Sequence, residues 1–251
     1  MLARLELILE GDEVDYRSSS NLQGVIMENI DTEYAKLLHE QVINPYSQYL
    51  IKKENCTVWC INTLTKEAYQ NIIKRLIDNE FSGFSIKDKK VNVKIKEKRL
   101  IHMDKQELMK QFYEEVGQKF YNIEFATPTS FKSNGKYVIF PNIEMIFKSL
   151  MNKYTYTSSE LDMYDEDTLE QIVNSCEITR YNLHSTSFPL EKVNIPAYKG
   201  SLSIRVNKGD TMSRYIRLLL KFGEYSGIGI KSSIGMGAVK LYELKKENGV
   251  N

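Results

Sequence analysis

The sequence has few of the residues that would place it outside ordinary globular proteins. Its 251 residues include only five prolines and thirteen glycines, which argues against a long disordered tract. No apolar run approaches the roughly 20 residues that span a bilayer. Charges at Arg4, Glu6 and Glu10 make the N-terminus unlike a signal peptide. A 42% apolar and 27% charged composition indicates a soluble globular protein, long enough for two domains of about 120 residues.

Cysteine and histidine are also scarce. The cysteines are three in number, an odd count, and Cys56, Cys60 and Cys176 do not have the spacing of a metal site. We therefore expect buried free thiols, no metal or other cofactor, and a reducing cytoplasmic location. The three histidines are His39, His102 and His184, so few side chains are available for proton transfer near neutral pH.

The net positive charge is low, but the charged residues are unevenly distributed along the chain. The net charge is +1. Residues 1–50 are mainly acidic, whereas residues 199–240 hold eight lysines and arginines against Asp210 and Glu224. Phosphate binding needs a local positive surface rather than a basic protein. The C-terminal stretch therefore favours a nucleic-acid partner, with a chance asymmetry on solvated faces as the alternative.

Hydrophobic periodicity predicts an N-terminal α+β unit. Leucines alternate with charged residues in a strand over residues 1–10. Helices are expected at about 20–30, after Asp31 or Thr32, and at about 66–77. Strands are expected around 49–51, 57–61, 81–86 and 91–95. The resulting order, β-α-β-β-α-β, is the ferredoxin-like pattern.

The second half repeats this order. Strands at about 122–126 and 137–140 precede a helix capped by Asn142, with apolar residues at helical spacing from Ile143 to Met151. A helix at about 168–175, a strand at 201–206, a helix from Asp210 and a strand containing Val239 follow. We predict an α+β fold of two tandem ferredoxin-like (RRM-like) domains, 1–115 and 116–251. Each is expected to be an antiparallel sheet with helices on one face.

One segment near the C-terminus concentrates glycine. It reads Gly227-Ile228-Gly229-Ile230-Lys231-Ser232-Ser233-Ile234-Gly235-Met236-Gly237. Glycine lets a backbone approach a phosphate closely, Lys231 adds charge, and the serines add hydroxyls. The residues that follow are strand-like, which argues against a nucleotide-hydrolysing Walker A loop. From the residues alone, a flexible hairpin before the last strand is the alternative.

Three further segments accompany this glycine segment. They are Leu37-Leu38-His39-Glu40 with Asn44-Pro45-Tyr46, the Thr-Pro segment Phe125–Lys132 leading to Phe140-Pro141, and Thr186-Ser187-Phe188 with Leu219–Gly227. In this order the four motifs resemble the CRISPR repeat-processing endoribonucleases, the sixth numbered Cas family of the RAMP superfamily. The resemblance is greatest to members from type III-A (Csm-associated) systems.

The resemblance implies a metal-independent endoribonuclease that cleaves precursor CRISPR RNA within its repeats. In this reaction the RNA 2′-hydroxyl attacks the adjacent phosphate and leaves a 2′,3′-cyclic phosphate and a 5′-hydroxyl. A base, an acid and positive charge are needed. His39 lies at the family's catalytic position. Several members carry a lysine shortly after this histidine, but here the next one is Lys52. Lys52 and Lys36, one helical turn before His39, are therefore the candidates for phosphate stabilisation.

The same resemblance predicts the RNA-binding residues and the partners. The expected RNA contacts are Gly227, Gly229, Lys231, Ser232, Ser233, Gly235, Gly237, Lys199, Arg205 and Lys132, helped by Arg214 and Arg217. The expected partner is CRISPR repeat RNA, with transient handover to a type III effector complex by a monomer or homodimer. Two alternatives stay open: a non-catalytic RNA-binding subunit of a CRISPR effector complex, and an unrelated ferredoxin-like protein that binds a small anionic ligand.

Overall fold

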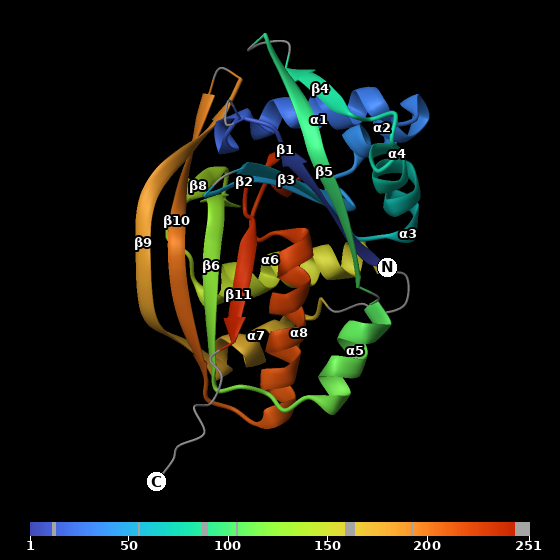
Figure 1. The fold of residues 1–251 in the computed structure, drawn as a ribbon. Helices are drawn as coiled ribbons and strands as arrows, with labels where there is room; N and C mark the ends of the chain where they lie inside the picture. The colour runs from blue at the N-terminus through green and yellow to red at the C-terminus, as the bar shows by residue number, and fades with distance from the viewer. Residues whose placement is uncertain are drawn as a thin grey trace.

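Two antiparallel sheets, each covered by helices on one face, form the fold in the computed structural model (Figure 1). The structure describes residues 1–11, 14–54, 56–86, 90–103, 105–158, 164–191 and 193–243. Within these ranges, no helix is long and apolar enough to cross a membrane.

The N-terminal sheet has the strand order β2-β3-β1-β5-β4. Its strands are β1 (Leu2–Leu9), β2 (Tyr46–Lys53), β3 (Cys56–Thr63), β4 (Gly83–Ile86) and β5 (Val91–Met103). Its helices are α1 (Ser19–Asn29), α2 (Thr32–Glu40), and a helical stretch of α3 (Lys66–Ala68), a π-turn (Tyr69–Ile73) and α4 (Lys74–Leu76). Leu5 and Leu7 of β1 are fully buried beneath these helices, as the alternation predicts.

The C-terminal sheet has the order β11-β6-β10-β9. Its strands are β6 (Phe120–Thr129), β9 (Cys176–Leu190), β10 (Val193–Val206) and β11 (Val239–Glu243), with a separate hairpin of β7 (Phe131–Ser133) and β8 (Lys136–Val138). The helices are α5 (Lys105–Glu114), α6 (Ile143–Tyr156), α7 (Glu166–Ser175) and α8 (Asp210–Ser226). In the N-terminal sheet β1 lies between β3 and β5, and in the C-terminal sheet β6 lies between β10 and β11. In each sheet the first strand of the unit is therefore central, which confirms the ferredoxin-like prediction.

The long β9–β10 hairpin is indicated only in part by the sequence. The strand expected at 201–206 is the end of β10, which begins at Val193. β9 spans 15 residues, and most of its side chains are exposed or half-buried. An edge strand of this kind shows no alternation of apolar residues, so periodicity does not reveal it. The helices after Asp31 and Asn142 begin where predicted, because both side chains accept hydrogen bonds from backbone N–H groups of the first turn.

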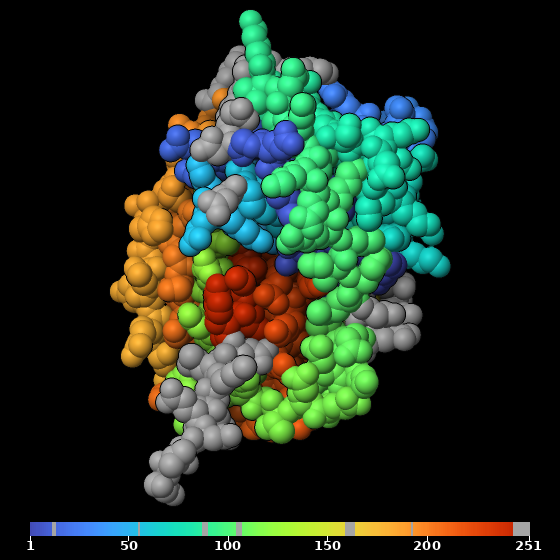
Figure 2. All heavy atoms as spheres, in the orientation of Figure 1, coloured from blue at the N-terminus to red at the C-terminus, as the bar shows by residue number. Residues whose placement is uncertain are grey.

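The face of the N-terminal sheet that is not covered by its helices packs on the C-terminal half. Its apolar residues are Ile8, Tyr49, Val58 and Cys60, which pack with Ala238. Arg4 of β1 donates to Asn62 Oδ1 of the neighbouring strand β3 (2.8 Å) and to the Glu224 carbonyl at the end of α8 (2.5 Å). Its guanidinium lies 4.9 Å from the centre of the Tyr225 ring. Figure 2 shows the two halves in contact, with the blue and cyan N-terminal strands above the red C-terminal residues.

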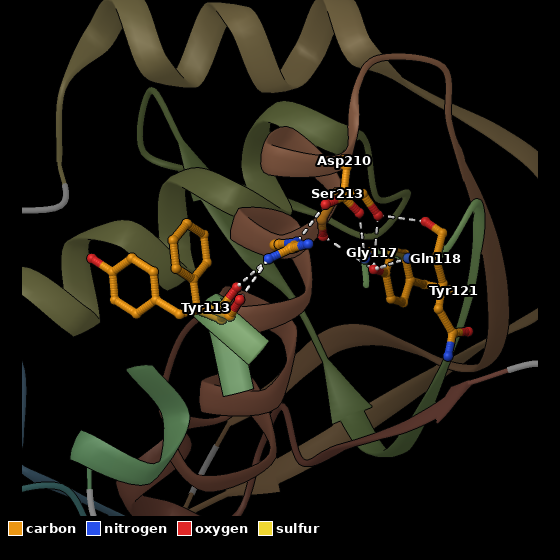
Figure 3. Close-up of polar contacts among 8 residues, drawn as sticks. Tyr113, Gly117, Gln118, Tyr121, Asp210 and Ser213 are labelled. Atoms are coloured by element: carbon orange, nitrogen blue, oxygen red, sulfur yellow. Dashed lines mark hydrogen bonds and ion pairs between the residues drawn. The ribbon is translucent and has the colours of Figure 1, made fainter. Parts of the chain in front are cut away.

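The connector between α5 and β6 is fastened to the start of α8 (Figure 3). The Gly117 N–H donates to the Asp210 carboxylate (2.7 Å), and the Ser213 hydroxyl donates to the Gln118 carbonyl (2.5 Å). The Tyr121 hydroxyl donates to the Ser213 carbonyl (3.0 Å). These bonds fix the connector against the C-terminal half. The domain limits 1–115 and 116–251 fall here, and they stay a prediction.

Candidate functional site

An open cavity of about 660 Å³ lies where the two halves meet. The N-terminal half contributes the loop between α2 and β2, and the C-terminal half contributes the β7–β8 hairpin, α6 and the glycine segment. The lining residues are Val42, Ile43, Asn44, Phe131, Lys132, Tyr137, Met145, Lys148, Ser149, Asn152, Lys153, Gly229, Ile230, Lys231, Ser232 and Ser233. Four of these described residues are lysines and none is acidic, so the cavity is suited to an anionic ligand.

The four glycines of the glycine segment are buried and have positive φ angles. A Cβ at Gly229 would overlap the carbonyl oxygen of Ser130, and a Cβ at Gly235 would overlap the side chain of Ser19. Glycine is therefore required because the backbone passes other protein atoms closely. Of the four, Gly229 contributes to the described cavity lining. Direct RNA contact by any of the four glycines stays a prediction.

The residues between the glycine pairs line the cavity. Lys231 is exposed, and Ser232 and Ser233 are half-buried in a short 3-10 turn. The Ser233 hydroxyl accepts a hydrogen bond from the Asn44 amide (3.4 Å) and also bonds the hydroxyl of Tyr46. The glycine segment is thus tied to the loop that follows His39.

Helix α6 supplies cavity residues that the sequence patterns do not single out. They share one helical face and are Met145, Lys148, Ser149, Asn152 and Lys153. The Ser149 hydroxyl accepts a hydrogen bond from the Gly229 N–H (2.9 Å). The apolar stripe of this helix reveals its buried side but not which element packs beside it. The polar residues next to the stripe can be recognised as cavity residues only when the glycine segment is seen to lie against them.

His39 is exposed in the last turn of α2, three residues before the cavity-lining Val42. Tyr34 and Leu38 on the same helix are buried in the N-terminal core and fix its position. Val42 is 94% exposed. The fold therefore places the predicted catalytic histidine next to the cavity-lining α2–β2 loop, although His39 itself is not among the residues that line the cavity.

The structure separates the two lysines that are predicted to assist His39. Lys36 lies one turn before His39 and forms an exposed ion pair with Glu33 (2.8 Å). Lys52 lies near the far end of β2, six residues beyond Tyr46, which is roughly 20 Å along an extended strand. Lys36 stays beside the histidine, whereas Lys52 is carried away from the α2–β2 loop.

The other predicted binding residues lie at different distances from the cavity. Lys132 lines it. Lys199 on β10 lies outside the lining, with its Nζ 5.4 Å from the centre of the Tyr16 ring. Arg205, near the end of β10, is ion-paired with Glu177. Two arginines of α8 are also ion-paired, Arg214 with Asp210 and Arg217 with Glu115. Of these basic residues, Lys132 is the one that lines the cavity and could contact a ligand bound there.

The cysteines are free thiols, with Cys60 buried and Cys56 and Cys176 half-buried. Burial raises the pKa of the Cys60 thiol to about 11 and that of Cys176 to about 12. In the part of the chain that the structure describes, no group of three His, Cys, Asp or Glu side chains could hold a metal ion. The cavity lining itself offers lysine, hydroxyl and amide groups.

Comparison with known proteins identifies the family. Residues 123–239 match the family model for the CRISPR-associated endoribonuclease Cas6. A Cas6 endoribonuclease from Streptococcus thermophilus is 38% identical over 223 residues, covering 88% of this chain and 90% of the relative. The chain belongs to the Cas6 endoribonuclease family. A Cas6 endoribonuclease from Mycobacterium tuberculosis is 33% identical over 97% of this chain and 79% of its own length.

Solved Cas6 structures share the fold. A Cas6 product complex superposes with a TM-score of 0.80 at 18% identity, covering 96% of this chain and 99% of the other. Thermus thermophilus Cas6 gives a TM-score of 0.72 at 18% identity over 96% and 98% of the two chains. These comparisons confirm the predicted family, the RAMP fold and the prediction of an endoribonuclease.

Proposed function

We propose that this Cas6 protein binds CRISPR repeat RNA in the cavity between its halves and cleaves the precursor within each repeat. One observation carries the proposal: the loop that follows His39 and the glycine segment line the same cavity, and its described lining holds four lysines without an acidic residue. Relatives of this fold are known as a product complex and as a substrate mimic complex. Binding through phosphates also explains why a protein of net charge +1 can bind RNA.

His39 is proposed to transfer the proton in a metal-independent cleavage. The RNA 2′-hydroxyl attacks the adjacent phosphate, its proton passes to a base, and the departing 5′-oxygen receives a proton from an acid. His39 can take either role because imidazole binds and releases protons near neutral pH. Lys231, Ser232 and Ser233, which line the cavity, are proposed to hold the phosphate backbone through charge and hydroxyl groups. Lys36 is the lysine nearest to His39 along its helix, and its exposed ion pair with Glu33 is weak enough to break on binding.

The decisive experiment is a denaturing gel of labelled repeat RNA with purified protein in EDTA. Wild-type protein should cleave the RNA and leave a 2′,3′-cyclic phosphate. His39→Ala should bind the RNA with similar affinity and lose at least about 100-fold in cleavage rate, the usual contribution of a general acid or base. His184→Ala is the matched control, because His184 is exposed like His39 but lies on β9 of the C-terminal sheet and not on α2 next to the cavity-lining loop. Undiminished cleavage by His39→Ala would remove the histidine from the mechanism.

The alternative of a non-catalytic RNA-binding subunit is disfavoured, because the relatives at 33% and 38% identity are Cas6 endoribonucleases. This alternative predicts salt-sensitive RNA binding with no cleavage by the wild-type protein. The same gel therefore separates the two candidates.

The biological setting is proposed from the motifs alone. Their similarity to type III-A members favours a cytoplasmic monomer or homodimer that hands the processed RNA to a type III effector complex. Co-purification of the protein with a type III complex loaded with repeat-derived RNA would support this handover.

A further inference from the structure

Lys153 of α6 is a buried lysine without a carboxylate partner among its hydrogen bonds. Its side chain lies under the glycine segment, and the residue is 8% exposed. The Nζ atom donates to the carbonyls of Ser226 (3.2 Å) and Gly227 (3.0 Å) and to the Ser232 hydroxyl (3.2 Å). An ammonium group has three N–H donors, so all of them are used within the protein.

These bonds join the end of α8 to the part of the glycine segment that faces the cavity. Ser226 is the last residue of α8, and Gly227 is its C-cap. The carbonyls at a helix C-terminus carry partial negative charge and favour a cation. Lys153 therefore acts as a cap for α8 and at the same time orients the hydroxyl of Ser232 at the cavity wall.

Burial makes the charge on this amine conditional. Removal from water lowers the pKa of Lys153 to about 7. The charged and titratable side chains that face the cavity with it are Lys148 on the same helix, Lys132 and Tyr137 of the β7–β8 hairpin, and Lys231 of the glycine segment. None of these supplies negative charge near neutral pH. An RNA phosphate in the cavity would supply it.

We propose that Lys153 is a positioning residue of the RNA site, and that repeat RNA binding is coupled to proton uptake by this one side chain. The inference rests on the proposed function. A protonated Lys153 donates a hydrogen bond to each of its three acceptors, and its positive charge stabilises a phosphate bound beside Ser232 and Lys231. A neutral amine has two N–H groups, so one acceptor loses its donor and the segment loses a positive charge. RNA binding consequently favours the protonated form.

The sign of the pH dependence follows from this coupling. In the free protein the amine loses its proton as the pH rises through about 7. Bound phosphate shifts the equilibrium towards the charged form, so the complex binds more protons than the free protein. Affinity for RNA should therefore be constant well below pH 7 and fall above it, by up to about tenfold per pH unit for one coupled proton.

The test measures the Kd of labelled repeat RNA between pH 6 and 9 at fixed ionic strength. The full chain carries His39→Ala, which keeps the RNA intact and removes the titration of that imidazole. This parent protein should lose affinity with rising pH as described. Lys153→Arg, which stays charged, should abolish the slope. Lys153→Gln should bind weakly at all pH values, also without the slope.

Lys148→Gln is the matched control. This lysine lines the same cavity from the same helix but is exposed, so its loss should weaken binding and leave the slope of the parent. A parent slope that persists in Lys153→Arg would overturn the inference. If the Lys153 variants fail to fold, calorimetry of the parent in two buffers of different ionisation enthalpy measures the proton uptake directly. Uptake of up to one proton is expected, increasing as the pH rises through about 7, and no uptake would refute the coupling.

The two proposals fail in different ways. A wild-type protein that does not cleave repeat RNA contradicts the proposed endoribonuclease function. A protein that binds and cleaves the RNA without proton uptake contradicts only the role of Lys153. A protein that binds no RNA contradicts both.

Discussion

Lys231 adopts a left-handed backbone conformation, with φ 57°, between the two glycine pairs. For a residue with a Cβ this conformation costs roughly 1–2 kcal/mol. A glycine there would avoid the cost, as it does at the neighbouring positive-φ positions. A strained residue at the wall of a cavity indicates a role for its side chain. Since that side chain is an exposed ammonium group, phosphate binding is the role that fits.

Replacing Lys231 by glycine should separate the two effects. The backbone strain is relieved while unfolded-state entropy rises, so the free energy of unfolding should stay within about 1 kcal/mol of wild type. Affinity for repeat RNA should fall about fivefold to tenfold, since a charge-assisted phosphate contact is lost. Filter binding and urea denaturation measure these quantities. Lys90→Gly is the control, because Lys90 is also left-handed (φ 52°) but lies outside the cavity lining; equal RNA losses in both variants would refute the assignment.

The glycine segment, taken as an element, is a packed connection between α8 and β11. Its 3-10 turn lies against β2 and α1 of the N-terminal half, and Ile234 and Met236 are buried with Phe188 and Ile195 of the β9–β10 hairpin. The segment therefore holds parts of both halves together and presents only its central residues to the cavity. This arrangement explains why a glycine-rich stretch is buried instead of mobile.

Gly235→Ala should unfold the protein more easily. The new methyl group would overlap the Ser19 side chain, and the φ of 113° is unfavourable for alanine; together these should cost about 2–4 kcal/mol. Gly24→Ala is the matched control. Gly24 lies in α1 with no atom near its position for a Cβ, so alanine should stabilise the protein by about 0.5–1 kcal/mol. Thermal unfolding measures both, and a Gly235→Ala protein as stable as wild type would show that the packing is loose.

At the scale of the whole molecule, the site exists because the two halves meet at one interface. Arg4 crosses this interface, and the Ser47 hydroxyl donates to the Tyr225 carbonyl (2.5 Å) beside it. Both contacts end on the last turn of α8, which leads directly into Gly227. The interface therefore sets the position of the glycine segment relative to the α2–β2 loop.

Arg4→Met should destabilise the whole molecule. It removes a half-buried cation and leaves the Asn62 amide oxygen and the Glu224 carbonyl without this donor, which should cost about 2–4 kcal/mol. The control is Arg99→Met, because Arg99 is exposed and pairs with Glu97 on its own sheet; its loss should cost less than about 1 kcal/mol. Urea denaturation compares the two. Equal effects would mean that the interface does not depend on Arg4.

The sequence by itself determined the elements and the family. Alternating leucines predicted β1, the caps at Asp31 and Asn142 predicted α2 and α6, and four motifs in order predicted the Cas6 resemblance. These signals are local, because strand alternation, helix caps and motifs are all read within a few residues. These signals did not predict the edge strand β9, because most of its side chains are in contact with water and its apolar residues do not alternate with polar ones.

Only the tertiary structure decided how the site is assembled. Lys148, Ser149 and Lys153 look like ordinary helix residues until the glycine segment packs beside α6. The need for glycine at these positions appears only when neighbouring protein atoms are seen to occupy the space that a Cβ would take. Lys52 looks close to His39 until β2 extends it away. In the first two cases the deciding contact joins residues far apart in the chain, and its energy comes from burial and close packing that a local pattern does not contain.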